Sequence, residues 1–203
     1  HVTGLAGSGS TDYRVDDAFV PEGRWLQLPT AVPRLDGPQW RFPFYGMLAA
    51  GVAAVAIGLL NGAVDRFAEI AVDKKPEGSG RTLSERASGQ TVLSSTEATA
   101  RSSLAFLHDV LGEAWETART GDPLTVEHRR SLRLAACDAA QRCADALGHL
   151  QREAGGSAVY LREPLQRMVR DGQVAATHAM VAPRIRELTG RLRLGLDTDT
   201  ALL

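Results

Sequence analysis

Cysteine and aromatic side chains are scarce in this sequence of 203 residues. The two cysteines, Cys137 and Cys143, fall on one expected helix, where their spacing corresponds to about 9 Å of rise. That separation excludes a disulfide between them, so we expect a reducing, cytoplasmic location. Aromatic residues make up only 5%, and the hydrophobic 44% relies largely on alanine and leucine. This composition favours helices over sheets.

An excess of charge and a long hydrophobic run are also missing. The formal net charge is −1, whereas a nucleic-acid-binding protein normally carries a basic excess, so we expect no nucleic-acid partner. The most apolar run, from Met47 to Leu60, is shorter than the roughly 20 residues that a membrane span needs. We interpret this run as a buried core helix and expect no membrane partner.

Motifs for metals and phosphates are absent as well. The histidines never stand at ligand spacing and neither cysteine has a CxxC partner, so we expect no metal site. No phosphate-binding loop of the usual glycine-rich pattern occurs. Arg129, Arg130 and Arg133 could form a phosphate patch, but the acidic residues between the basic ones favour a solvated helix face.

The first 45 residues do not have a helical pattern. In residues 1–25, Tyr13 and Val15 alternate with charged residues, which predicts a strand with one buried face. Residues 26–45 are rich in proline and read as a linker. This segment holds Pro29, Pro33, Pro38 and Pro43.

The remainder, residues 46–203, is predicted to be helical. Its four expected helices cover roughly 46–75, 82–119, 126–153 and 164–192. Thr82 opens a capping-box spacing, Thr125 can cap the third helix, Gly155 and Gly156 end it, and Pro164 suits the first turn of the fourth. Long helices joined by short loops favour an antiparallel four-helix bundle, so the predicted fold class is mainly α.

His178 is the candidate catalytic residue. It falls on the apolar stripe of the expected fourth helix, between Ala175 and Ala182. A core histidine whose ring nitrogens are satisfied by neighbours is the simpler interpretation of that spacing. Pro183 favours a site, because it cannot donate to the carbonyl group of Ala179 and opens that turn.

Three sequence blocks carry a resemblance to a known family. They are TGLAGSGSTDYRVDDAFVPEGR at 3–24, RRSLRLAACDAA at 129–140, and AGGSAVYLREPLQRMVRD at 154–171 with ATHAMVAP at 176–183. Together they resemble the C-terminal part of the acyl-CoA dehydrogenase superfamily, and more closely its flavin-dependent monooxygenase branch. The resemblance implies that residues 1–25 end a middle β-domain, that 46–203 form the C-terminal bundle, and that the chain is a truncated polypeptide.

The resemblance also implies roles for single residues. Dehydrogenases of this superfamily use a glutamate base after the Arg-Asp pair, but Ala179 takes its place here, and no acid occurs between Asp171 and Glu187. In the monooxygenase branch a histidine stands at the position of His178. There it deprotonates a phenolic substrate or holds the oxygen-bearing flavin through a hydrogen bond, a role that suits an imidazole.

Four further residues are candidates for flavin binding, with FAD or reduced FMN as the expected cofactor. Arg152 stands where dehydrogenases place a glutamine near the flavin adenosine, although a surface role is as plausible. Gly155 and Gly156 would let the backbone approach a neighbouring subunit's flavin, or would only stop a helix. Arg81 falls near a family arginine that binds the pyrophosphate, but two residues out of register.

The function that these residues predict is that of a two-component monooxygenase. A separate flavin reductase would supply reduced flavin, and oxygen would be transferred to an aromatic or heteroatom-bearing small molecule. We expect a homo-oligomer, a dimer or tetramer, associated through the bundle. An acyl-CoA dehydrogenase proper and a non-catalytic oligomerisation fragment remain as alternatives.

Overall fold

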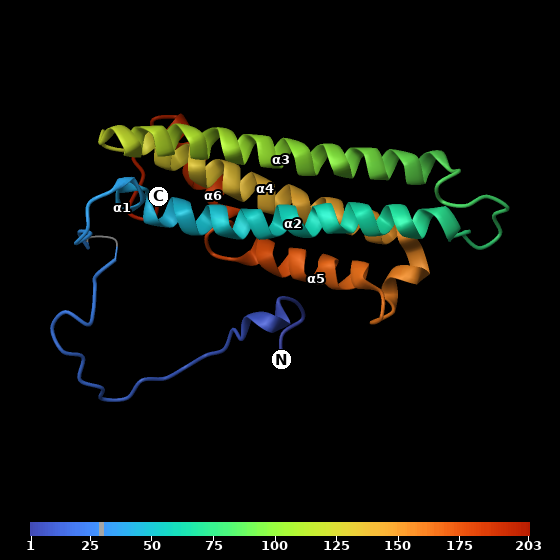
Figure 1. Ribbon diagram of the computed structural model, residues 1–203, viewed down its shortest axis with the longest axis horizontal. Helices are drawn as coiled ribbons and strands as arrows, with labels where there is room; N and C mark the ends of the chain where they lie inside the picture. The colour runs from blue at the N-terminus through green and yellow to red at the C-terminus, as the bar shows by residue number, and fades with distance from the viewer. Residues whose placement is uncertain (29–30) are drawn as a thin grey trace.

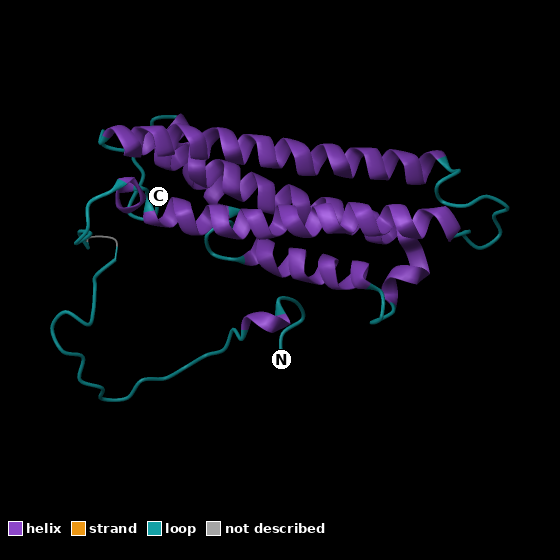
Figure 2. Cartoon of the chain, viewed as in Figure 1, coloured by secondary structure: helices purple, strands orange, loops and turns teal. Residues whose placement is uncertain are grey.

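The computed structural model describes residues 1–28 and 31–203, and long helices dominate it (Figure 1). The helices are α1 (Pro38–Arg41), α2 (Phe44–Asp73), α3 (Ala87–Thr120), α4 (Val126–Ala154), α5 (Pro164–Thr177) and α6 (Arg184–Arg193), with the short 3-10 helices η1 (Ala6–Ser8) and η2 (Gly155–Val159). Figure 2 shows only helices and loops over these described ranges. The prediction of a mainly α fold is confirmed. Pro29, in the predicted linker, lies outside the described residues.

The long helices run antiparallel to one another. In Figure 1, α2, α3 and α4 lie side by side and alternate in direction, and α5 packs against α2 and α4. The fourth position of the expected bundle is divided between two helices, because α5 ends at Thr177 and α6 packs separately on α4. The prediction of one continuous helix over residues 164–192 is therefore wrong.

Helix α4 lies at the centre and contacts every other long helix. Its buried stripe matches the predicted one and includes Leu132, Ala136, Cys143, Leu147 and Leu150. At Gly172 of α5, an added methyl group would overlap the side chain of Leu147, so the two helices approach closely there. Truncating such a buried leucine to alanine typically costs about 2–5 kcal/mol of stability.

Helix α2 has one buried face and one exposed face. Ala49, Ala53, Leu60 and Phe67 are fully buried, so the interpretation as a core helix is confirmed for that face. Met47 and others on the opposite side remain exposed. By length and hydropathy alone, α2 is also the one helix in the described ranges that could cross a membrane, with only 33% of its most apolar window buried.

Three predicted helix signals are confirmed, but the predicted start of the second helix is wrong. Thr125 accepts a hydrogen bond from the His128 amide at 3.2 Å, Gly155 ends α4 with a positive φ of 62°, and Pro164 begins α5. Helix α3, however, begins at Ala87 rather than at Thr82. Residues 82–86 instead form a loop that is held against the end of α2, because the amide of the buried Leu83 donates a hydrogen bond to the Lys74 carbonyl oxygen at 2.8 Å.

The strand predicted around Tyr13 and Val15 is not formed. Both side chains are exposed, at 87% and 66%, and the backbone from 9 to 20 makes no ladder. A strand is stable only when a neighbouring strand receives its backbone hydrogen bonds, and no such neighbour exists among the described residues.

A partly buried ion pair fixes the beginning of α5. Arg66 of α2 donates to both carboxylate oxygens of Glu163, with Nε–Oε1 and Nη2–Oε2 distances of 2.8 Å. Glu163 is also the N-cap of α5, since its side chain accepts from the Leu165 amide at 3.2 Å. The guanidinium group of Arg66 holds the pKa of Glu163 below its usual range.

We expect Glu163→Gln to lower the free energy of unfolding at neutral pH by about 1–3 kcal/mol, because it removes a charge-assisted pair and weakens the cap. A carboxyl group with a lowered folded-state pKa stabilises the fold above its unfolded-state pKa of about 4.3 and loses that effect as the pH falls. The difference between wild type and variant should therefore shrink on acidification below about pH 5 in urea titrations. Glu69→Gln, at the exposed partner of Arg66, is the control, and an equal loss there would contradict the assignment.

Candidate functional site

The turn between α5 and α6, residues 178–183, carries the predicted catalytic histidine. Pro183 has no amide hydrogen and its ring opposes the preceding helical turn, so α5 stops at Thr177. A side chain of α4 supports the turn on both sides of this break. Gln141 Nε2 donates to the carbonyl oxygens of Ala176 at 2.7 Å and of Val181 at 3.0 Å, on both sides of the turn. This glutamine, which sequence reasoning missed, holds the turn in place.

His178 does not lie in the core. The sequence predicted it on the buried side of a continuous helix, whereas the structure places it as the C-cap of α5 with an exposed side chain. The reason is that the helix has ended, so the stripe that passes through Ala175 no longer continues to residue 178. The histidine is therefore available to a molecule that binds outside this bundle.

The imidazole of His178 has one occupied and one free nitrogen. Nδ1 accepts a hydrogen bond from the Met180 amide at 3.2 Å. In the neutral ring, an accepting Nδ1 puts the proton on Nε2. Nε2 has no partner among the described residues, so this side chain can donate a proton or a hydrogen bond outward.

The N-terminal segment docks on α5 two helical turns before this histidine. The Leu5 amide donates to Oδ1 of Asp171 at 2.6 Å, and Leu5 itself adopts φ 53°. At Gly4 an added methyl group would overlap the carbonyl group of Arg170, so only glycine allows this approach. The contact joins two of the sequence blocks that carried the resemblance, 3–24 and 154–171.

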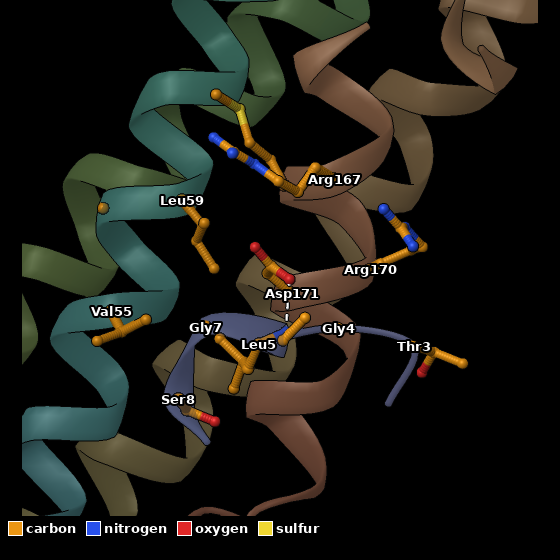
Figure 3. Close-up of a pocket in the computed structure, with 13 residues that line it drawn as sticks. Thr3, Gly4, Leu5, Gly7, Ser8, Val55, Leu59, Arg167, Arg170 and Asp171 are labelled. Carbon is orange, nitrogen blue, oxygen red and sulfur yellow. Dashed lines mark hydrogen bonds between the residues drawn. The ribbon is translucent and has the colours of Figure 1, made fainter. Parts of the chain in front are cut away.

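A cavity of about 680 Å³ opens between this segment, α2 and α5 (Figure 3). Val55 and Leu59 of α2 form an apolar wall, while Arg167 and Arg170 of α5 add positive charge. Figure 3 shows Asp171 between these walls, bonded to the docked segment. An apolar wall with a few charged groups suits a flat organic molecule that carries negative charge.

The cavity lies along the body of α5, and His178 caps the C-terminal end of the same helix. Asp171 precedes His178 by seven residues, which is two turns and about 10 Å along a helix. Sequence reasoning gave Asp171 and Leu5 no role. The one signal that could have found them was the joint occurrence of the 3–24 block and the Arg-Asp pair.

The predicted flavin-binding residues lie elsewhere. Arg152, Gly155 and Gly156 are exposed at the end of α4, and a methyl group added at either glycine would meet open space. Arg81 is exposed in the loop between α2 and α3, which lies at the same end of the bundle as η2 in Figure 1.

Two separate groups therefore result, one at each end of α5. The 14 residues of α5 span about 20 Å, which separates His178 from the Gly155 group. This chain offers a flavin one open surface beside His178, whose Nε2 is a free donor. Nothing in the described part of the chain encloses that surface from the other side.

We expect Asp171→Ala to release the N-terminal segment. The Leu5 amide loses its acceptor, so its hydrogen exchange should become about tenfold faster or more, while the helices keep their protection. Gly4→Ala should have the same effect, because the methyl group collides with Arg170. Gly7→Ala, which meets no neighbour, is the control; unchanged exchange at Leu5 in the first two variants would refute the docking contact.

Comparisons with known proteins agree with this architecture. The family described as "Acyl-CoA dehydrogenase, C-terminal domain" matches residues 50–183. The chain is 30% identical to the indole-3-acetate monooxygenase of Pseudomonas putida, over 95% of this chain and 49% of that protein.

Two solved structures share the fold. The 3-HSA hydroxylase from Rhodococcus sp. RHA1 superposes with a TM-score of 0.89 at 21% identity, over 100% of this chain and 54% of that chain. XiaF from Streptomyces sp., in complex with FADH2 and glycerol, gives 0.80 at 24%, over 89% and 48%. The chain thus spans about half the length of the proteins it matches. It belongs to the family of acyl-CoA dehydrogenase C-terminal domains.

Proposed function

We propose that this chain acts as the C-terminal half of a flavin-dependent monooxygenase of the two-component type. The observation that carries the proposal is the turn after α5, which exposes His178 with Nδ1 fixed by the Met180 amide and Nε2 free. Such an imidazole can hold a proton at Nε2 toward an oxygen-bearing cofactor or take one from a phenol. When bound, reduced flavin would react with dioxygen and so provide the oxygen atom for transfer, and a separate reductase would supply the reduced flavin.

Acyl-CoA dehydrogenation is less well supported. It needs a carboxylate base at the position that Ala179 occupies, and alanine cannot accept a proton. The next acid along the chain, Glu187, is exposed on α6 beyond the proline break. The turn that would carry the base therefore offers an imidazole only.

The substrate that we propose is an aromatic or heteroatom-bearing small molecule. Support comes from the name of the Pseudomonas putida relative, a monooxygenase of the aromatic acid indole-3-acetate. The FADH2 bound to XiaF supports reduced flavin as the cofactor. In this chain, the cavity at Asp171 with its apolar wall and two arginines has the size and polarity for one of these molecules.

We further propose that the chain works in a cytoplasmic homo-oligomer, a dimer or tetramer. The separation of His178 from Gly155 and Gly156 by the length of α5 fits a site completed by a neighbouring subunit, whose flavin would lie near the two glycines. Exposed apolar side chains on the long helices, such as Met47 of α2 and Trp115 of α3, support association through the bundle.

In an enzyme that joins this chain to the preceding domains of the family, we expect His178→Ala to reduce substrate hydroxylation at least about hundredfold, the scale of a lost general acid or base. Flavin affinity should change little, and hydrogen peroxide should appear in place of product. The measurements are product formation, peroxide release and flavin binding in parallel.

His108→Ala is the matched control, since His108 is an exposed histidine on α3 away from the turn. It should leave all three quantities unchanged. Full hydroxylation by the His178 variant would refute the catalytic role. Flavin bleaching on addition of acyl-CoA without oxygen would favour the dehydrogenase instead.

Alone, this chain should bind flavin weakly, because the exposed turn gives the cofactor one wall and no enclosure. Fluorescence titration with FMN and FAD should give no saturation in the low micromolar range. Tight stoichiometric binding would contradict the division of the site between domains. If the chain formed oligomers but bound no flavin, either alone or joined to the preceding domains, the non-catalytic oligomerisation fragment would be favoured.

A further inference from the structure

Arg133 of α4 is a buried charge without an acidic partner. It is only 1% exposed and is the one charged side chain in the described ranges that is buried. Its Nη1 donates to the Tyr45 carbonyl oxygen at 3.3 Å and points at the Met180 sulfur at 3.1 Å. Its Nε has no hydrogen-bond partner, and no carboxylate within the described part of the chain lies within ion-pair distance.

The burial of Arg133 without a counter-charge costs free energy unless an anion binds to it. A buried guanidinium that meets only a carbonyl and a thioether loses its hydration without regaining a counter-charge. Burial and the nearby positive charge of Arg184 both lower the pKa of Arg133, but a guanidinium stays protonated at any physiological pH. The sequence suggested a solvated face for this arginine, and its burial corrects that interpretation.

Arg133 reaches a cavity of about 300 Å³ between α4, α6 and the C-terminal tail. Arg184 and Arg191 of α6 line the same cavity, and neither forms an ion pair with a described residue. Arg191 donates only to the carbonyl oxygen of Asp197, at 2.8 Å. The two acidic groups at the cavity, Glu187 and Asp199, have exposed side chains. Three arginines therefore line one cavity, and the most buried of them, Arg133, has no acidic partner among the described residues.

We propose that this cavity binds a small oxyanion, a carboxylate or a phosphate, with Arg133 as the inner ligand and Arg184 and Arg191 as outer ligands. A planar guanidinium donates strong hydrogen bonds to such oxygens, so a bound oxyanion supplies the counter-charge that Arg133 lacks. Apolar walls from Met180, Ile185 and Leu202 exclude water around the contact. The negative charge of an anion bound between Arg133 and Arg184 also offsets the repulsion between the two guanidinium groups.

The site goes beyond the proposed function and does not rest on flavin. Ala179 and Met180 line it, directly after His178, so a bound anion contacts the same turn. The bound anion stabilises the folded chain, because only the folded state assembles the three arginines.

The test is thermal unfolding of this chain with sodium phosphate, acetate or phenylacetate, each against sodium chloride at equal ionic strength. We expect a saturable rise in the melting temperature with at least one oxyanion and none with chloride. A stronger response to phosphate identifies a phosphate ligand, and a stronger response to phenylacetate than to acetate identifies an aromatic carboxylate. Equal responses to all salts would overturn the proposal.

Arg133→Met keeps the length of the side chain and removes its charge. It should weaken the oxyanion response at least about tenfold, yet leave the anion-free chain at least as stable as wild type. Arg142→Met, at an exposed arginine of the same helix, is the control and should keep the full response. A wild-type response in the Arg133 variant would overturn the proposal.

Three substitutions at exposed residues test the charge argument independently. Glu187→Gln and Asp199→Asn each remove an exposed negative charge at the cavity, so each should raise the oxyanion affinity about two- to fivefold. Arg184→Gln should lower it by a similar factor. Affinity unchanged by all three would show that the ion binds elsewhere and would refute the site.

Discussion

Pro183 interrupts the helix that would otherwise continue from α5 into α6, and the candidate site depends on that interruption. The broken turn leaves carbonyl groups without amide donors, and these need partners in a buried setting. Gln141 supplies two of them, to Ala176 and Val181, and Cys137 lies 3.5 Å from the Ala182 carbonyl oxygen. Without the break, residue 178 would point along the core stripe and could not reach a ligand.

A single stripe of α4 therefore serves the turn. Arg133, Cys137 and Gln141 follow one another at intervals of four residues, so they share one face of the helix. Each meets a residue between 176 and 182: Arg133 meets Met180, Cys137 meets Ala182, and Gln141 meets Ala176 and Val181. The apolar stripe next to it, through Leu132 and Ala136, holds the core. The face of α4 that packs in the core and the face that supports the turn are therefore offset by about one residue around the helix.

Much of the fold was predictable because its signals are local. Apolar periodicity located α2 and α4, and the caps at Thr125, Gly155 and Pro164 act within a few residues of themselves. The start of α3 was not predictable in this way, since it depends on a bond from Leu83 to Lys74 across the loop. The strand near Tyr13 also failed for a non-local reason, because a period-two pattern says nothing about whether a partner strand is present.

The site was harder to predict for the same reason. The sequence identified His178 and the proline that affects it. The prediction, however, extended the helical periodicity through the break, and this placed the imidazole ring in the core. Nothing near Asp171 in the sequence signals that Leu5, far along the chain, will donate to it. Arg133 was assigned to a solvated face because acidic residues lie between the basic ones along the helix, whereas its burial follows from contacts with Tyr45 and Met180.

The positions of these polar groups have an energetic consequence for the whole helix. A methionine at 133 would fill similar space without a desolvation cost, so stability alone does not favour arginine there. Gln141 could be replaced by an apolar residue without loss of stability only if the turn were continuous helix. In the broken turn, the two carbonyl oxygens need the hydrogen bonds that Gln141 donates. Arg133 differs, since the carbonyl oxygen and sulfur that it meets do not need a full charge. An apolar substitution at 141 should therefore unsettle the turn, whereas one at 133 leaves the turn intact and removes only what the charge attracts.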